Sequence, residues 1–443
     1  MNRNSKILVA KSAVAAVVIP AILYAFAAGP DPRHTGAPGD QTCAKATCHV
    51  GTPAMGGVEI DFPSGTSYTP GVRQRWTVRI TGATGRVYGF QATARLASNL
   101  PNGQAGGFFP VDGRTLVLCD DGKDKNQSPV GCNAQTPVEF IEHRLAGSSN
   151  SFTFEWAPPA ENVGNVRVYV AGNAANGNGQ ADSGDRIFLA NFTLWPPPQI
   201  RTEQPVLQVF SGIAGLSSGT WLEIYGTNLS STTREWAGSD FSGNRAPTVL
   251  DGVSVNINSR PAFVRYISPT QINVQAPDDD STGPVSVEVV NPGGRASVTV
   301  NKTRTSPALL TTPAFIVGGR QYVAALHTDL QTFVGRTNLI AGVPFRPARP
   351  NDRIIIYAVG CGPTNPASPA GVIVSEVSPL ASPFQVSFGT TAATEAQAFL
   401  SPPFIGLCRF DVTVPNVPDG DIQIDARVDG TITGQTLFTT IQR

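Results

Sequence analysis

The sequence predicts an all-β protein made of tandem β-sandwiches, and three observations support this fold class. Of 443 residues, 45 are Gly and 37 are Pro, which is typical of a chain with many turns. Short runs alternate between apolar and other residues, and turn-forming residues separate them. From residue 30 onward, nothing has the periodicity of a long amphipathic helix.

The overall composition excludes several classes of protein. Charged residues make up only 14% of the chain and the formal net charge is zero, so a nucleic-acid-binding surface is not expected. The hydrophobic content of 41% is sufficient for packed cores and argues against a disordered chain. At roughly 100–150 residues per domain, the length predicts about three domains.

Residues 1–27 have the features of a secretory signal peptide. Its basic start holds Arg3, Lys6 and Lys11. The apolar run over residues 12–28 follows, and residues 25–27 form the small-residue pattern of a cleavage site. The alternative is an uncleaved anchor, for which the run is short and is interrupted by Pro20. We therefore expect a secreted protein, extracellular, at the cell surface or in the periplasm, with no transmembrane segment after cleavage.

Residues 28–57 contain the most specific chemical motif in the chain. Cys43 and Cys48 are followed directly by His49. Two thiols and an adjacent imidazole are the groups that attach a c-type haem, through two thioethers and one iron ligand. The usual spacing has two residues between the cysteines, whereas four stand here, so a disulfide between Cys43 and Cys48 is the alternative.

A haem held at His49 would have a second ligand or an open position on its iron. His34 lies nine residues before Cys43, and Met55 lies six residues after His49, so either is near in sequence. His143 would approach from the following domain. These three residues are the candidate distal ligands.

Residues 58–195 are expected to form the first sandwich. Period-two runs occupy residues 76–80, 152–156 and 166–170, with turn residues between them. Three consecutive prolines follow Trp195, and we interpret residues 196–205 as a stiff linker.

The remainder of the chain repeats itself. Residues 222–228 are echoed by residues 354–360, and the alternating run 285–289 is echoed by 422–426. The offset of roughly 130–140 residues indicates two related sandwiches. Their predicted bounds are 206–303 and 304–443.

The other four cysteines form two pairs, each inside one predicted domain. Cys119 and Cys132 lie in the first sandwich, and Cys361 and Cys408 lie in the last. An even number of cysteines in an exported chain favours a structural disulfide in each.

These segments resemble known families. Residues 58–195 resemble the Reeler domain in the runs 89–92, 152–158 and 168–177. Residues 206–443 resemble the IPT/TIG immunoglobulin-like fold, at residues 226–229 and 360–366, in the arrangement of an uncharacterised C-terminal domain of secreted acidobacterial-type proteins. The cysteine segment resembles the haem-motif peptide that precedes bacterial Reeler-like domains. The resemblance implies an exported surface protein and brings no established activity with it.

Two further motifs have simpler explanations. Two loops offer oxygen ligands for calcium: one includes Asn173 and Asp185, and the other follows Cys119. Neither loop has the EF-hand spacing, so ordinary turns are favoured. Ser217 stands in a G-x-S-x-G pattern, but a strand is predicted directly after it, where a hydrolase has a helix. We therefore do not expect an enzyme.

The sequence thus predicts a surface β protein carrying one covalent c-type haem, for extracytoplasmic electron transfer or a haem-bearing structural role. The alternative is an adhesive or structural protein without haem, with a Cys43–Cys48 disulfide. Expected partners are an extracellular protein, a polysaccharide, a redox partner or a second copy of the chain, and not nucleic acid.

Overall fold

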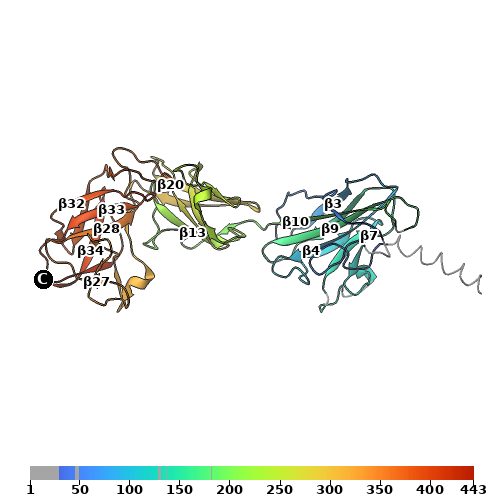
Figure 1. Ribbon diagram of the computed structural model, residues 1–443, viewed down its shortest axis with the longest axis horizontal. Coiled ribbons are helices and arrows are strands. Elements are labelled where there is room, and N and C mark those ends of the chain that lie inside the picture. Colours follow the sequence, from blue (N-terminus) through green and yellow to red (C-terminus); the bar gives the residue numbers. More distant parts are fainter. Residues whose placement is uncertain (1–28, 45–48, 128–130, 136, 181) are drawn as a thin grey trace, which may run out of the picture. The chain divides into compact units, whose positions relative to one another are not determined.

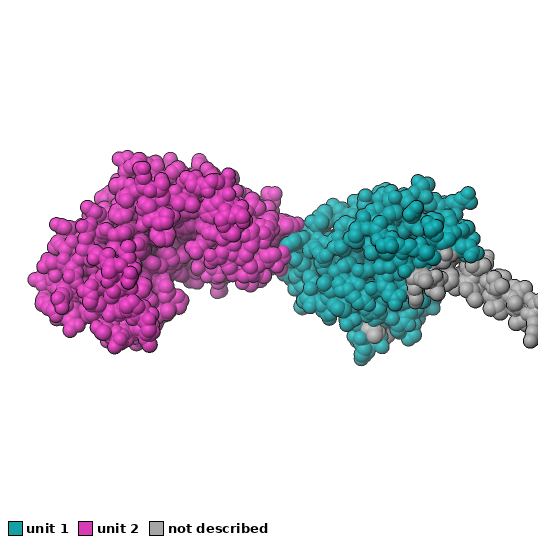
Figure 2. All heavy atoms as spheres, viewed as in Figure 1, with its two compact units in different colours: residues 1–197 teal, residues 198–443 magenta. Residues whose placement is uncertain are grey.

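Strands form nearly all the regular structure in the computed structural model, which describes residues 29–443 apart from 45–48, 128–130, 136 and 181. The chain divides into two compact units, residues 1–197 and residues 198–443 (Figures 1 and 2). Helical structure among the described residues is limited to single 3-10 turns at η2 (Lys125–Gln127), η3 (Gly238–Asp240) and η4 (Pro313–Phe315). The prediction of an all-β chain is confirmed.

The first unit is a sandwich of two sheets. One sheet contains, in spatial order, β1 (Ala54–Met55), β10 (Arg186–Leu194), β9 (Val166–Ala175), β4 (Val87–Leu96), β7 (Glu139–His143) and β6 (Thr115–Cys119). The other contains β2 (Val58–Asp61), β3 (Gln74–Ile80), β8 (Ser151–Ala157) and β5 (Gly107–Pro110).

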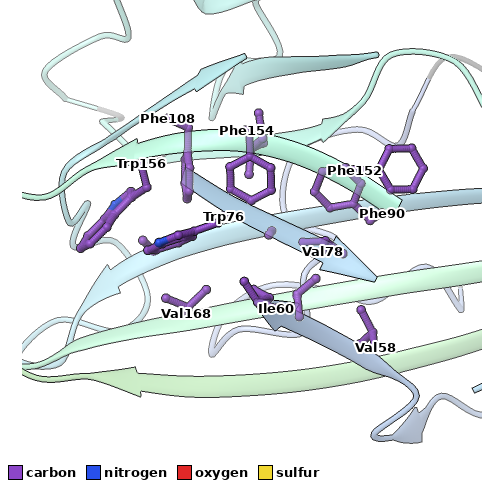
Figure 3. Close-up of a cluster of buried hydrophobic side chains, with 14 of the residues drawn as sticks. Val58, Ile60, Trp76, Val78, Phe90, Phe108, Phe152, Phe154, Trp156 and Val168 are labelled. Atoms are coloured by element: carbon purple, nitrogen blue, oxygen red, sulfur yellow. The ribbon is translucent and has the colours of Figure 1, made fainter. Parts of the chain in front are cut away.

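Aromatic side chains fill the space between these two sheets. Trp76 of β3 and Trp156 of β8 are fully buried, with ring centroids 4.6 Å apart. Phe90, Phe108 and neighbouring apolar side chains complete the cluster (Figure 3). In β3 and β8 the buried residues alternate along the strand, as the period-two pattern predicts.

The strands β4 and β9 depart from that pattern, because they are buried along both faces. One face carries the aromatic core. The opposite face is covered by the segment 29–43, where Cys43 packs against Ala171 of β9 and Ile187 of β10. The cysteine-containing peptide is therefore packed on the sandwich as part of its structure, and β1 extends the same sheet beside β10.

The second unit contains two sandwiches, each with its own core. The first has one sheet of β11 (Gln199–Ile200), β13 (Trp221–Thr227), β19 (Gln271–Gln275), β18 (Phe263–Ile267) and β14 (Arg234–Glu235), with β12 (Val206–Gln208) beside β13. Its other sheet has β15 (Val249–Leu250), β16 (Val253–Ile257), β20 (Gly283–Asn291) and β21 (Gly294–Lys302), with β17 (Arg260–Pro261) beside β16. The predicted linker thus includes a short strand, β11.

The second sandwich repeats this plan with additional edge strands. One sheet has β27 (Phe345–Arg346), β26 (Phe333–Val334), β25 (Leu326–His327), β28 (Arg353–Val359), β33 (Cys408–Thr413), β32 (Ala396–Leu400) and β29 (Ser378–Pro379), with β22 (Ala308–Leu309) beside β28. The other has β23 (Ile316–Val317), β24 (Arg320–Tyr322), β36 (Leu437–Ile441), β34 (Gly420–Val428), β30 (Phe384–Phe388) and β31 (Thr391–Ala392), with β35 (Thr431–Ile432) beside β34.

The internal repeat predicted from the sequence is visible in the strand pairing. β13 pairs with β12 and β19 in the first sandwich, and β28 pairs with β22 and β33 in the second. The strands β20 and β34, which hold the two echoed alternating runs, both lie inside their sheets. The chain therefore contains two related sandwiches in tandem.

The two sandwiches of the second unit also contact each other directly. Trp221 Nε1 donates a hydrogen bond of 2.8 Å to Ile405 O, and Gly371 N donates one of 2.7 Å to Gln275 Oε1. Apolar side chains surround both bonds. This packing explains why residues 198–443 form one unit.

Candidate functional site

A cavity of about 440 Å³ in the first unit brings together residues that are far apart in the sequence. His34, Cys43 and His49 reach it from the N-terminal segment, and His143 reaches it from the end of β7. The ends of β4 and β9 and the loop after β9 complete the wall. Its volume lies in the usual range for a small-molecule or cofactor site.

The structure places two of the three candidate distal ligands at the cavity. His34 and His143 both line the cavity, whereas Met55 does not, and its residue is 69% exposed on β1. Cys48 lies outside the described residues. His34 and His143 are therefore the two candidates that the fold places beside His49.

A buried ion pair fixes the N-terminal segment to the sheet. The Asp40 carboxylate accepts a bond of 3.0 Å from Arg95 of β4, and both side chains are fully buried. Thr35 Oγ1 donates to the same carboxylate at 2.7 Å, and Arg33 contacts it at 3.3 Å. Burial lowers the pKa of Arg95, and Asp40 opposes this effect. This network determines where His34 and Cys43 lie.

Gln91 of β4 makes a second connection between the segment and the sheet. Its Oε1 accepts a bond of 2.7 Å from His34 N, and its Nε2 donates to Asp31 O at 3.0 Å and to Glu142 Oε2 at 2.8 Å. Burial raises the pKa of Glu142 to about 9, so this carboxyl is neutral at physiological pH. Gln91 thereby places the backbone of His34 directly on β4.

The ring of His34 has one satisfied nitrogen and one unsatisfied nitrogen. Nδ1 lies 2.9 Å from Asp31 O and 3.2 Å from Pro32 O, and both are acceptors, so Nδ1 carries the proton. Nε2 is buried and has no hydrogen-bond partner. A buried polar atom without a partner costs about 1–3 kcal/mol. Other atoms of His34 line the cavity.

The ring of His49 is held by two polar residues. Nδ1 lies 2.6 Å from Asp185 Oδ2, and the Asp185 side chain is only 3% exposed. Nε2 lies 2.8 Å from Asn173 Nδ2, while Asn173 Oδ1 is buried without a partner. A histidine whose Nδ1–H donates to a carboxylate is the arrangement that orients imidazole ligands to metals.

The ring of His143 contacts the backbone of Phe90. The backbone N–H of Phe90, which can only donate, lies 3.1 Å from His143 Nδ1. That nitrogen also lies 3.1 Å from Phe90 O. Burial lowers the pKa of His143 and the hydrogen bond with the Phe90 backbone opposes this effect.

The four remaining cysteines form the two predicted disulfides. Cys119 pairs with Cys132 and Cys361 pairs with Cys408. Cys43 is buried at the cavity, with its Sγ 3.8 Å from His34 O. Both disulfide predictions are confirmed.

The oxygen-rich loops make contacts that the sequence did not indicate. Asp185 and Asn173 contact His49, and Asp182 accepts bonds from Asn176 and Asn178. Over the described parts of residues 29–443, no cluster of three or more His, Cys, Asp or Glu side chains has the geometry to hold a metal ion.

Sequence reasoning missed the residues that build the site around the histidines. Gln91 and Arg95 are long polar residues inside a mostly apolar strand, and that position is the signal that could have identified them. The sequence indicates Asp185 only as a possible oxygen ligand in a Gly-rich loop, because its pairing with His49 spans 136 residues.

Ser217 does not have the surroundings of a nucleophile. Its residue is fully buried, and its Oγ lies 2.6 Å from Thr220 Oγ1. The strand β13 begins at Trp221, directly after this turn, as the sequence predicted.

In the part of the chain that the structure describes, no helix is long and apolar enough to span a membrane.

Comparison with solved structures finds Reeler domains. The Reelin-N domain of F-spondin is 14% identical, with a TM-score of 0.23, over 33% of this chain and 89% of that domain. A human F-spondin reeler domain is likewise 14% identical with a TM-score of 0.23, over 32% of this chain and 95% of that domain. No residue role follows from similarity at this level.

Comparison with protein families identifies one segment of the second unit. No curated protein matches the chain. Residues 205–306 match the IPT/TIG domain family and cover the first of the two tandem sandwiches. The chain therefore contains an IPT/TIG domain at the position where the sequence predicted one, residues 206–303.

Proposed function

We propose that this chain is an exported, surface-associated β protein whose first domain holds one c-type haem in the cavity beside His49. One observation carries the proposal. Cys43 and three imidazoles from distant parts of the sequence line a single cavity, and one buried imidazole nitrogen there lacks a partner.

The residues present fit a haem. Cys43 and Cys48 would form the thioethers, and His49 would be an iron ligand through Nε2. Bound haem supplies one-electron redox chemistry. Asp185 accepts the Nδ1 proton of His49, which orients the ring and makes Nε2 a stronger electron donor. Asn173, which donates to His49 Nε2 at 2.8 Å, would release that nitrogen on haem attachment.

Export is supported by the disulfides and by the domain types. Disulfides persist in oxidising compartments, and the described residues include a disulfide in each unit. The IPT/TIG domain and the sandwich architecture suit an extracellular or periplasmic location. Partners of the proposed protein would be a redox protein, a surface polysaccharide or another copy.

The test is an absorption spectrum and a haem stain of the denatured full chain, expressed with cytochrome c maturation proteins. We expect a Soret band that survives denaturation and is lost in Cys43→Ala and Cys48→Ala. The matched control is Cys119→Ser/Cys132→Ser, which removes a disulfide from the same domain and should leave the haem in place.

A colourless chain in which Cys43 and Cys48 are disulfide-bonded would contradict the haem proposal. That outcome would favour the adhesive or structural alternative, in which the sandwiches present loops and sheet edges to a partner. Intact mass before and after reduction, together with cysteine mapping, distinguishes the two outcomes.

A further inference from the structure

The two sandwiches of the second unit are joined by a loop that leaves β28 and reaches the first sandwich. We call residues 360–377 the long loop. Gly371 O accepts a hydrogen bond of 2.7 Å from Ala246 N, and Ile373 N donates one of 2.9 Å to Asn244 O. These two bonds add to the one that Gly371 N donates to β19. The long loop therefore holds the first sandwich through its main chain.

A second loop, residues 401–407 between β32 and β33, contacts the first sandwich beside the long loop. Trp221 Nε1 donates to Ile405 O at 2.8 Å, and Val374 N of the long loop donates to Phe404 O at 3.2 Å. Apolar side chains of both sandwiches pack around these contacts. We call the contacts that these two loops make with the first sandwich the joint.

The disulfide between Cys361 and Cys408 connects the two loops of the joint. Cys361 lies two residues after β28 ends at Val359, and Cys408 is the first residue of β33, directly after the second loop. Gly360 and Gly362 flank Cys361 with φ of +72° and +80°, in the left-handed region that favours glycine. One covalent bond thus fixes both loops where they meet the second sandwich.

The disulfide also links the long loop to the centre of a sheet. β33 lies inside its sheet, between β28 and β32. The pairing of Thr364 with Leu380 holds the long loop near β29, which lies at the edge of the same sheet. A cross-link lowers the number of conformations available to a loop. Loss of the disulfide would therefore release the long loop from the sheet centre.

Both cysteine residues of this disulfide border a cavity at the joint. Cys361 and Cys408 line a cavity of about 670 Å³, whose walls include Gly219 and Asp278 of the first sandwich and Thr364 of the long loop. The two cysteines are only 2% and 1% exposed. Thiol exchange at a buried disulfide needs a local opening, and movement of the joint would provide one next to these residues.

We propose that this disulfide is a redox-sensitive switch that holds the joint closed when it is oxidised. A dithiol reductant attacks one sulfur through its thiolate, which forms a mixed disulfide and releases the other cysteine as a thiolate. The second thiol of the reductant then displaces the first cysteine. Two electrons and two protons pass to the protein, and the reductant becomes a disulfide. The reduced long loop loses its hold on the first sandwich, so the two sandwiches move independently, whether or not haem is bound.

The test measures hydrogen exchange of the full chain before and after dithiothreitol is added under native conditions, with free thiols mapped. We expect Cys361 and Cys408 to become free thiols. The amides of Ala246 and Gly371, which donate across the joint, should then lose their protection from exchange. The amide of Ile356, inside β28, should stay protected.

Two double variants distinguish this disulfide from the one in the first unit. Cys361→Ala/Cys408→Ala should show fast exchange at the joint without reductant and no further response to it. Cys119→Ala/Cys132→Ala is the matched control, and its joint should stay protected until dithiothreitol is added. If the first variant folds poorly, the wild-type chain with and without reductant still makes the comparison.

Three results would overturn the proposal. The first is a disulfide between Cys361 and Cys408 that stays intact in the folded, treated chain. The second is a joint that keeps its protection in Cys361→Ala/Cys408→Ala or in the reduced wild type. The third is an equal loss of protection at Ile356 and at the joint, which would show that the disulfide only stabilises the core of its own sandwich.

Discussion

At the scale of single residues, the first unit contains several buried polar side chains. Gln91, Arg95, Asp40, Glu142 and Asn173 are each buried. Each has a partner that lies on another segment, so removing one member leaves a desolvated group behind. The consequences are measurable as changes in stability.

Asp40 is the first residue to test. Asp40→Ala leaves the buried Arg95 guanidinium without its counter-charge, so we expect the free energy of unfolding of the first unit to fall by about 3–5 kcal/mol. Urea denaturation measures this change. The control is Asp121→Ala, which breaks an exposed pair with Lys123 and should have little effect. Equal losses in the two variants would show that burial of the Asp40 pair is unimportant.

Glu142 should make stability depend on pH. Its folded pKa is about 9, whereas an unfolded Glu titrates near 4.3, so the folded state retains a proton that the unfolded state releases between these values. Stability is then lost as pH rises through this window. Glu142→Gln carries no such proton, so its stability relative to wild type should increase by roughly 1–3 kcal/mol between pH 5 and pH 8. Denaturant unfolding at both pH values tests this, and parallel pH profiles would contradict it.

At the scale of elements, the position of the His143 ring depends on a glycine in the neighbouring strand. A Cβ on Gly89 of β4 would lie 2.5 Å from His143 Cε1. Gly89→Ala should therefore displace the ring or the strand and lower the free energy of unfolding by about 1–3 kcal/mol. Gly113→Ala is the matched control, because a Cβ there has open space around it. Thermal unfolding of both variants tests this expectation. Equal stability of Gly89→Ala and Gly113→Ala would contradict steric crowding at Gly89.

At this scale, local patterns in the sequence predict features that depend on one strand. They miss features that depend on contacts between distant segments. The alternation at residues 76–80 and 152–156 correctly predicts strands with one buried face. From Val168 to Ala174 every position of β9 is buried, and Cys43 from the N-terminal segment packs on Ala171 within this stretch. No local pattern records a cover that comes from elsewhere in the chain. Proximity to Cys43 in the sequence points to His34 and His49, whereas the pairing of His49 with Asp185 depends on the fold.

At the scale of the whole molecule, the chain consists of two units with separate cores. Calorimetry of the full chain should therefore show two transitions. Asp40→Ala should shift only one of them, and Trp221→Ala, which removes a contact between the two sandwiches of the second unit, should shift only the other. A single transition shifted by both variants would contradict independent unfolding.

The packing of residues 29–43 against β9 and β10 has a consequence for the timing of biogenesis. Translation proceeds from the N-terminus, so Cys43 emerges well before the strands that cover it, which lie more than 120 residues later in the chain. Until those strands arrive, Cys43 has no sheet to pack against. The order of synthesis therefore leaves this thiol accessible for an interval, and completion of the sandwich ends that interval.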